Sequence, residues 1–547
     1  MSPSMTRNRR LSPAAGLLLL AACASSTPAV APSGKALLPD AGVAVAGTPD
    51  APFRQTLPKP GPPVTFQPPV PTVFKLKNGL PVWVLEKHDI PLVTVEMVVA
   101  AGEDTDPARR PGTASFVADM LDEGTRTRDA ASIATAFEDQ AAVFRTQADG
   151  DSMAAAVSFP AGALTPVLEV FADCLLHPMF RSKDVERVRA LRLGDLAQLE
   201  ADPAQVGKTL LGRTVFGEDH PWAFPSLGTV SSLKAIRPSE LTAWHGAWVK
   251  PNNAVLIVVG DVKAPELLAQ LQSRFGTWKP AKLPKRRSVA PRPHKGPRVI
   301  TVVDRPGAAQ SSVWVGELGI GASSADLYPA QLAVTVLGGG YKSRINGNLR
   351  SAKGYSYGAF SFFEVQREPG VFATYAPVVA DKTPEALTEI LGELRRLREG
   401  GIDDLELAEA KAGLIQSLPA EFETTTATAL TFGRVWALGR PPDFFVEYTR
   451  KIEAVTRDQV AAAAAQRFRP EAVSIVVVGP LADLKPRLEA LELGPLDVRN
   501  ASGEAEATPP VRPSCHLRDS PHLEPWHRPC SGRQRAGSAA GALDQDY

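Results

Sequence analysis

The chain repeats itself at one constant spacing, and this repeat limits what it can fold into. A proline leads into a run of branched apolar residues that ends at a glycine, first over 251–260 and again over 470–479. The two copies are 219 residues apart, and the segments upstream of them, 235–241 and 454–460, match at the same spacing. A unit of this size is far too long for a solenoid repeat, so we expect two homologous domains in tandem.

Each copy follows the same order of patterns. A strand pair opens the first copy over 74–85, where Asn78-Gly79 indicates a tight turn. Long amphipathic segments follow, such as 384–399, in which apolar residues recur at helical spacing at Leu387, Ile390, Leu391, Leu394 and Leu397. A buried apolar strand before a glycine closes each copy. The sequence therefore predicts an α+β fold, with two tandem homologous α+β domains that each pack a sheet against helices.

The N-terminus is typical of an exported protein. Three arginines within 7–10 precede an apolar run over 11–22, which is too short to cross a hydrocarbon core of about 30 Å as a helix. The run ends in Leu20-Ala21-Ala22-Cys23, which resembles the bacterial lipobox, so we expect Cys23 to be lipidated. The alternative is an ordinary cleaved signal peptide in which the cysteine is incidental.

The residues after the cysteine favour one location. Ala24 and Ser25, rather than an aspartate, follow Cys23, which by analogy with enteric bacteria favours the outer membrane. We therefore expect a lipid anchor in the bacterial cell envelope, at the outer membrane and facing the periplasm. Residues 24–71 are rich in proline and alanine and predict an extended tether. The net charge of +1 gives no electrostatic reason to expect nucleic acid as a partner.

Short motifs in the body of the chain occur in a fixed order. They are Leu80-Pro81-Val82, the segment 88–93, Ala101-Gly102-Glu103, the segment 217–221, Pro251-Asn252-Asn253, Val258-Val259-Gly260-Asp261, and Leu337-Gly338-Gly339-Gly340 with Ser343-Arg344-Ile345. In this order they resemble the pitrilysin, insulinase and mitochondrial processing peptidase family of inverted zincins. The resemblance extends over about 72–490 and covers both repeats. It implies that the two domains form one half-shell of a peptidase chamber.

The resemblance and the composition together predict six segments. These are a lipoprotein signal peptide with lipobox (1–23), a Pro/Ala-rich tether (24–71), a first peptidase-like domain (72–280), a linker (281–298), a second peptidase-like domain (299–495) and a disordered tail (496–547). The tail contains Cys515, His516, His522, His527 and Cys530, but it is rich in proline and arginine and lacks periodicity, which predicts disorder rather than a metal site. Its abrupt change of composition is also what a shifted reading frame would produce.

The resemblance implies a zinc motif that this chain has lost. Active members carry H-x-x-E-H on a helix of the first domain, where two histidines bind zinc and the glutamate polarises water. Alignment on the segment 123–125 puts Ser115 and Asp119 at the histidine positions, Ala118 at the glutamate and Asp195 at the third ligand. We therefore predict no metal bound by this chain. A weak Mg²⁺ or Ca²⁺ site at the three polar positions and a solvated acidic cavity are the alternatives.

The helix that would carry the motif is preserved in the sequence. Phe116, Val117, Met120 and Leu121 form an apolar stripe at helical spacing. Gly124 follows at a position where it can end the helix as a C-cap. We therefore expect an intact helix without its ligands.

The second domain keeps the residues that the family uses there. Arg350 and Tyr357 resemble the arginine–tyrosine pair that faces the zinc, binds the substrate backbone and stabilises the oxyanion. The alternative is a solvated helix arginine and a strand tyrosine packed against its neighbours. The loop of Gly338, Gly339 and Gly340 is a further candidate for substrate binding, because glycine lets a backbone approach closely. Its alternative is a tight helix C-cap.

These features lead to two hypotheses about function. The first is a non-metal-binding subunit of a heterodimeric zinc metallopeptidase, inactive alone, that contributes Arg350 and Tyr357 to a homologous partner carrying H-x-x-E-H. This hypothesis expects zinc in the partner subunit, no cofactor in this chain and an unfolded peptide as substrate. The second is a non-catalytic structural or peptide-binding lipoprotein of the same fold. No Ser-His-Asp or Cys-His motif supports a hydrolase that uses other residues.

Overall fold

The computed structural model describes the body of the chain, namely residue 61 and the ranges 66–287, 290–291 and 298–505. The predicted signal peptide with Cys23, most of the predicted tether and the tail beyond 505 lie outside the described residues. Within the described ranges, no helix is both long enough and apolar enough to cross a membrane.

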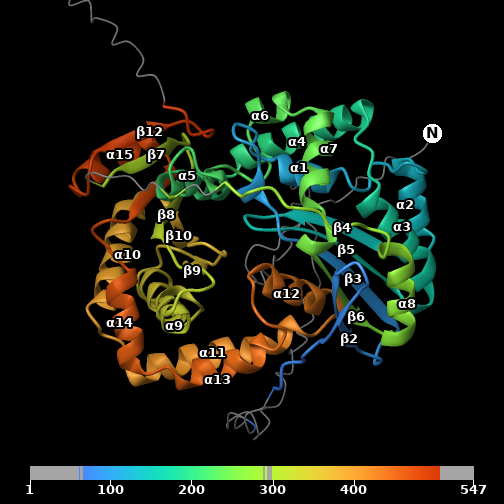
Figure 1. Cartoon of the computed structure of the whole chain (residues 1–547). Helices are drawn as coiled ribbons and strands as arrows, with labels where there is room; N and C mark the ends of the chain where they lie inside the picture. Colours follow the sequence, from blue (N-terminus) through green and yellow to red (C-terminus); the bar gives the residue numbers. More distant parts are fainter. Residues whose placement is uncertain (1–60, 62–65, 288–289, 292–297, 506–547) are drawn as a thin grey trace, which may run out of the picture. The chain divides into compact units, whose positions relative to one another are not determined.

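The first domain is built around a six-stranded sheet (Figure 1). Its strands are β1 (Thr72–Lys75), β2 (Pro81–Glu86), β3 (Leu92–Val99), β4 (Val143–Ala148), β5 (Met153–Pro160) and β6 (Ala254–Gly260), in the order β1-β2-β6-β3-β5-β4. Only the β2–β6 pair is parallel. β6 lies inside the sheet and every one of its residues is buried, as its unbroken apolar sequence predicts.

The second domain repeats this sheet. Its strands are β7 (Ile300–Asp304), β8 (Gln310–Leu318), β9 (Phe360–Glu364), β10 (Val371–Val379), β11 (Ser474–Gly479) and β12 (Leu496–Arg499), in the order β12-β7-β11-β8-β10-β9. β11 is parallel to β7 and antiparallel to β8, just as β6 is parallel to β2 and antiparallel to β3. The two closing strands of the sequence repeat therefore occupy equivalent places, and the prediction of tandem α+β domains is confirmed.

Residues 496–499 differ from what the sequence predicts. They stand at the start of the predicted disordered tail, yet they form β12, which pairs in parallel with β7 at the edge of the second sheet. Leu496 and Val498 alternate with charged residues, which is the pattern of a strand with one face packed. The change of composition after this strand is what hides the pattern in the sequence.

Helices cover the faces of both sheets (Figure 1). Those of the first domain are α1 (Thr113–Asp119), α2 (Ala130–Glu138), α3 (Leu164–Leu176), α4 (Ser182–Ala201), α5 (Pro203–Phe216), α6 (Val230–Ala235), α7 (Pro238–Trp248) and α8 (Ala264–Phe275). Those of the second are α9 (Leu327–Gly338), α10 (Thr383–Arg398), α11 (Asp404–Glu421), α12 (Thr425–Ala437), α13 (Phe444–Ala454), α14 (Arg457–Arg467) and α15 (Leu481–Glu489). The helix predicted over 384–399 corresponds to α10, and its five predicted core residues are buried.

Each domain contributes one helix that packs on the sheet of the other domain. α5 of the first domain packs on β8 and β11 of the second sheet, and α12 of the second domain packs on β3 and β6 of the first. In β6, Val255, Ile257 and Val259 belong to the apolar core that contains α12, whereas the alternate residues belong to the core of the first domain. Because side chains alternate along a strand, one strand contributes to both cores.

A buried carboxylate marks the contact of α12 with the first sheet. Glu96 of β3 is 1% exposed, and a methyl group at Gly433 of α12 would overlap its carboxylate. Desolvation raises the pKa of Glu96 well above its ordinary value, and the charge of Asp149 adds to the shift. The absence of a side chain at 433 is what lets α12 lie against β3.

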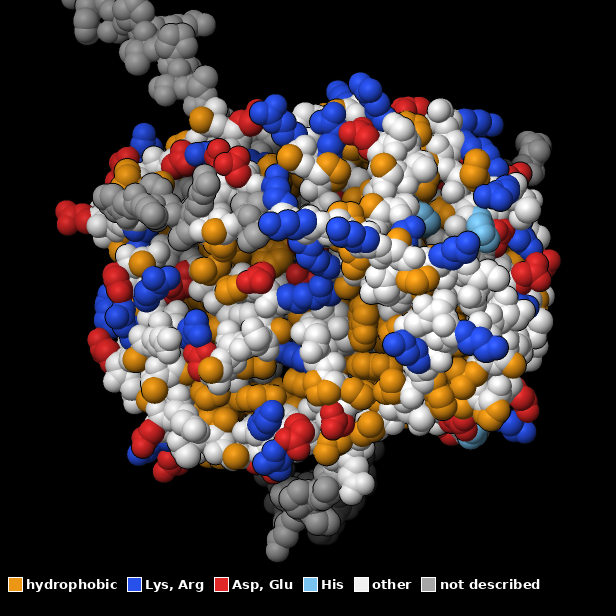
Figure 2. Space-filling model, in the orientation of Figure 1, with side chains coloured by type: hydrophobic (Ala, Val, Ile, Leu, Met, Phe, Trp, Pro, Cys, Tyr) orange, Lys and Arg blue, Asp and Glu red, His pale blue; other side chains and the backbone are white. Residues whose placement is uncertain are grey.

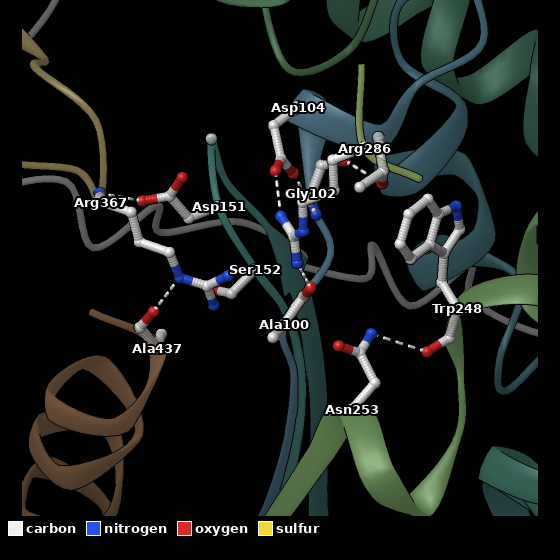
Figure 3. A network of polar contacts seen from close by, with 12 residues as sticks. Ala100, Gly102, Asp104, Asp151, Ser152, Trp248, Asn253, Arg286, Arg367 and Ala437 are labelled. Atoms are coloured by element: carbon white, nitrogen blue, oxygen red, sulfur yellow. Dashed lines mark hydrogen bonds and ion pairs between the residues drawn. The ribbon is translucent and has the colours of Figure 1, made fainter. Parts of the chain in front are cut away.

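An arginine of the segment between the domains binds the first domain. Arg286 forms an ion pair with Asp104 and donates a hydrogen bond to the carbonyl of Ala100. Its guanidinium lies 5.6 Å from the centroid of the Trp248 ring (Figure 3). The N-terminal part of the linker is therefore held against the first domain by the ion pair with Asp104 and by the contact of the Arg286 guanidinium with the Trp248 ring.

A second arginine joins the domains directly. The backbone N–H of Arg367, between β9 and β10, donates to the carboxylate of Asp151 at 2.6 Å, and its guanidinium donates to the carbonyl of Ala437 at the end of α12 (Figure 3). Desolvation raises the pKa of Asp151 to about 6 and lowers the pKa of Arg367. Arg367 thus ties the exchanged helix to a turn of the first domain.

The contact of α5 with the second sheet can be tested at a glycine. A side chain at the buried Gly207 would overlap the indole of Trp314 on β8. We expect Gly207→Ala to lower the free energy of unfolding by about 1–3 kcal/mol, because the methyl group overfills this interface. Gly194→Ala on the exposed side of α4, where nothing lies within 4 Å, should raise it by about 1 kcal/mol. Denaturant unfolding measures both, and equal effects would contradict the packing described.

Candidate functional site

α1 carries the positions of the lost zinc motif and is set in place from its N-terminus. Gly112, with φ +87°, precedes the helix, and the backbone of Leu227 and Gly228 approaches it too closely for a side chain. The carboxylate of Asp106 accepts hydrogen bonds from the N–H groups of Gly112 and Ala114, both at 2.7 Å. These bonds satisfy donors that a helix start leaves unpaired.

The predicted helix is present but shorter than expected. The four residues of its predicted apolar stripe are fully buried. It ends at Asp119 with Met120 in the right-handed conformation, so Gly124 is not its C-cap. Gly124 instead has φ +148° and forms a β-bridge with Asp129, in the turn after the helix.

A buried arginine joins the two positions at which the resemblance places the zinc-binding histidines. Arg192 of α4, 1% exposed, donates to Oγ of Ser115 at 2.7 Å and forms an ion pair with Asp119. It also donates to the carbonyl of Leu227 at 3.0 Å, and its guanidinium lies 4.9 Å from the centroid of the Phe116 ring. Arg192 is not among the predicted site residues.

One signal in the sequence could have indicated Arg192. The buried face of α4 runs through Val185, Val188 and Leu196, and Arg189 and Arg192 interrupt it at the same helical spacing. Arginine is rarely buried unless it is paired. A partner for each was therefore to be expected in the core of the first domain.

These residues do not fit zinc. Ser115 donates its hydroxyl to the carbonyl of Ser226, Asp119 is paired with Arg192, and Ala118 offers no donor atom. A catalytic zinc site needs three nitrogen, sulfur or carboxylate ligands, and a guanidinium repels a cation. Over the residues that the structure describes, no group of three or more His, Cys, Asp or Glu side chains could hold a metal ion.

The same contacts argue against the two alternatives for this site. A Mg²⁺ or Ca²⁺ ion at Ser115, Asp119 and Asp195 would compete with the guanidinium for Asp119. The structure bears out a solvated acidic cavity only in part, because Ser115 is 8% exposed and Arg192 1%, whereas the side chain of Asp119 is 30% exposed and paired with Arg192. The site is a packed polar contact in which an arginine balances a carboxylate.

Two further carboxylates lie next to this contact. Desolvation raises the pKa of Asp106 to about 7, against the opposing effect of the backbone hydrogen bonds from α1. Desolvation also raises the pKa of Glu103 to about 8; a hydrogen bond from Ser226 opposes this shift, and the charges of Asp106, Asp149 and Glu364 add to it. Since Ser226 also accepts from Ser115, Glu103 belongs to the same network.

The predicted residues of the second domain lie on a well-packed backbone with their side chains outward. Arg350 is exposed on a π-helical turn over Asn346–Ala352, and its guanidinium lies 4.8 Å from the ring centroid of Tyr341. Tyr341 is 65% exposed and Tyr357 86%. The structural alternative is therefore wrong for Tyr357, which is not packed against its neighbours, whereas Arg350 is a solvent-exposed helix residue, as that alternative expects. Tyr341 is a residue that the sequence motif did not indicate.

Asn346 connects the three predicted elements of this region. Its side-chain N–H groups donate to the carbonyls of Gly340 at 3.0 Å and Ala359 at 2.7 Å, and its Oδ1 accepts from the N–H of Ala359 at 2.9 Å. The amide is 2% exposed. One buried side chain thus holds together the glycine loop, the turn that carries Arg350 and the strand that follows Tyr357.

The three glycines have different surroundings. A side chain at Gly338, the last residue of α9, would overlap Ser361 of β9, so this glycine permits close packing. Gly339 is the C-cap residue of α9, in the right-handed conformation, and its N–H donates to the carbonyl of Thr335, so the alternative of a tight helix C-cap is confirmed at this residue. Gly340 is exposed, with nothing within 4 Å of a side chain built there. Of the three, Gly340 has the open surroundings that a substrate contact requires.

Hydrophobic and charged side chains are not mixed evenly on the surface. In the face drawn in Figure 2, hydrophobic side chains gather in the lower middle, below a group of Lys and Arg side chains, and charged side chains of both signs are frequent toward the margin. An apolar surface of this kind is typical of a region that contacts a partner or a peptide.

The half-buried acid Glu103 predicts a pH dependence. Its folded pKa of about 8 lies above the unfolded value, so the stability that it contributes is complete at acidic pH and is lost as the pH rises through about 8. Glu103→Gln mimics the protonated form and should reduce the fall in melting temperature between about pH 5 and about pH 8. Glu138→Gln, at an exposed position on α2, is the control and should keep the native pH profile. Identical profiles for both variants would contradict the raised pKa of Glu103.

Comparisons with known proteins agree with this architecture. The model of the insulinase family (peptidase family M16) matches residues 82–221, and the model of the peptidase M16 inactive domain matches 235–414, which together are more than half of the chain. An uncharacterized zinc protease from Mycobacterium tuberculosis is 26% identical over 393 residues, which are 71% of this chain and 88% of that protein.

Solved structures share the fold. A peptidase M16 inactive domain from Pseudomonas fluorescens superimposes with a TM-score of 0.69 at 23% identity, covering 75% of this chain and 98% of that one. A chain of complex III2 from Candida albicans has a TM-score of 0.63 at 15% identity, covering 76% and 99%. The chain therefore belongs to the insulinase family of peptidases, family M16, as a member that lacks the family's zinc motif.

Proposed function

We propose that this chain is the non-metal-binding subunit of a two-subunit zinc peptidase. Its role is to present Arg350 and Tyr357 to a homologous partner that carries H-x-x-E-H. The observation that carries the proposal is an asymmetry between the domains. Ser115 and Asp119, at the former histidine positions, are bound to an arginine, whereas Arg350 and Tyr357 are exposed on a backbone that buried side chains hold in place.

The chemistry of the two residues suits this role. Zinc in the partner would supply the activation of the attacking water. Arg350 is a fixed cation and Tyr357 a phenolic donor, and both favour negative charge as it develops on the carbonyl oxygen of a peptide. The segment that carries Tyr357 is fixed by Ser356, whose hydroxyl donates to the carbonyl of Pro377 at 2.6 Å. Such support reduces the loss of conformational freedom when a substrate binds.

The substrate that fits this proposal is an unfolded peptide. The hydrophobic side chains in the middle of the face in Figure 2 support a ligand that offers apolar side chains together with a free backbone. The second candidate is a structural or peptide-binding subunit without any catalytic partner. The pairing of Asp119 with Arg192, which leaves no zinc site on α1, favours this candidate. A chain of complex III2 has the same fold.

The location belongs to the same proposal. We expect lipidation at Cys23 to hold the body in the bacterial envelope, at the outer membrane and facing the periplasm, through the tether that follows. Cys23→Ser should move the protein from the membrane fraction to the soluble periplasmic fraction. Retention of this variant in the membrane fraction, without incorporated fatty acid, would contradict a lipid anchor.

The catalytic role can be measured on the assembly that co-purifies with this chain after mild detergent extraction. Arg350→Ala should reduce kcat/KM for a peptide by roughly 100- to 1000-fold, the usual effect of removing an oxyanion donor. Tyr357→Phe, which loses one hydrogen bond to a charged group, should reduce it by roughly 10- to 100-fold. Arg450→Ala on the exposed face of α13 is the matched control and should leave cleavage unchanged.

The outcomes separate the two candidates. Size-exclusion chromatography should show the same assembly for all three variants, because the substituted side chains are exposed. Unchanged cleavage with both Arg350→Ala and Tyr357→Phe would contradict their proposed role. Peptide binding without cleavage, and no zinc in the assembly, would favour the structural or peptide-binding subunit.

A further inference from the structure

We propose that Arg192 takes the structural place of the metal ion in the first domain. The guanidinium cation then keeps α1 and α4 in contact without zinc. Restoring the zinc-binding residues on α1 does not restore zinc binding while Arg192 remains. This inference concerns the chain by itself and needs no partner subunit.

The geometry of the contact is that of a bridge between two helices. Ser115 and Asp119 are one helical turn apart on α1, and the guanidinium of Arg192 reaches both from α4. A zinc ion held by histidines at these two positions and by Asp195 of α4 would join the same pair of helices. Arginine and metal are therefore alternative links between α1 and α4.

The guanidinium is held by more than these two side chains. It donates to the carbonyls of Leu227 at 3.0 Å and Gly112 at 3.3 Å, and Phe116 covers it with an aromatic face. These contacts come from α1, from its N-terminal turn and from the loop before α6. Because Arg192 is 1% exposed, it cannot turn out toward solvent unless this packing opens.

Charge gives the contact a second function. The carboxylates of Asp119 and Asp106 both interact with Arg192, and Asp106 is held in place by backbone N–H groups of α1. Removal of one partner from a buried ion pair leaves the other charge uncompensated, which destabilises a fold strongly. Asp119 stands where the zinc motif has a neutral histidine, so this chain carries an extra negative charge on α1 that Arg192 balances from α4.

The same cation blocks the return of the metal. Arginine stays protonated at any pH at which the protein is folded, so it cannot become neutral to make room for a divalent ion. Zinc beside a buried guanidinium would bring like charges together where little water screens them. The loss of zinc binding therefore rests on three positions, Ser115 and Asp119 on α1 and Arg192 on α4.

The experiment compares three sets of substitutions in the full chain. The first set is Ser115→His, Ala118→Glu and Asp119→His. The second set adds Arg192→Ala to these three. The third set is the matched control and adds instead Arg189→Ala, which removes the neighbouring buried arginine of α4, one turn earlier and also near Phe116. Bound zinc is measured by elemental analysis after dialysis, and melting temperature is measured with zinc and with a chelator.

We expect only the second set to take up about one zinc ion per chain, with histidine, histidine and Asp195 as ligands, and to gain melting temperature when zinc is added. The first and third sets should stay at the zinc level of the native chain. Equal zinc uptake by the first and second sets would overturn the inference. A folded second set without zinc would also overturn it.

A single variant keeps the inference testable if the second set fails to fold. Arg192→Ala in the native chain should have a lower melting temperature, and methylguanidinium at concentrations too low to denature should raise it by refilling the cationic position. Methylurea, which has a similar shape and no charge, should not. No difference between the two compounds would mean that the position does not require a cation, which overturns the proposal.

Discussion

The exchange of α5 and α12 is the constraint on which the rest of the structure depends. A sheet has two faces, and in each domain one face is covered by a helix that the other domain supplies. β6 shows the consequence within one strand, because alternate residues enter the cores of different domains. Neither sheet buries both faces with its own domain alone, so the two domains are held together by apolar clusters that both of them build, one around α12 and one around α5.

In the first domain, a buried arginine links α1 and α4 where the zinc-binding members of the family have a metal ion. Zinc sites cross-link elements through coordination bonds, and a buried arginine does so through hydrogen bonds and charge. Arg192 performs this function between α1 and α4, but a guanidinium cannot activate water. The helix is kept because Phe116 and its apolar neighbours belong to the core, so α1 is required for folding even when its chemistry is gone.

The parts of the fold that local sequence determines could be predicted, and the parts that depend on distant contacts could not. The closing strands β6 and β11 and the helix α10 follow from unbroken apolar runs and helical spacing. The exchange of α5 and α12 could not be predicted, because an apolar helix face does not specify which sheet it covers. Arg192 was missed for the same reason, since its partners on α1 are more than seventy residues away. The end of α1 at Asp119 was wrongly placed at Gly124, whose positive φ serves a later turn.

The second domain differs from the first in what its packing leaves exposed. Asn346 and Ser356 are buried and hold the backbone on both sides of Tyr357, yet the tyrosine is 86% exposed and Arg350 lies in solvent. Folding alone gives no reason to hold the backbone around Tyr357 with buried hydrogen bonds when the side chains of Arg350 and Tyr357 make so little contact with the rest of the domain. Fixed polar side chains on a rigid support are what a preorganised binding surface requires. In the first domain Ser115 and Asp119 are bound to Arg192, whereas Arg350 and Tyr357 of the second domain are exposed, and this contrast is the basis of the proposal that the second domain binds substrate.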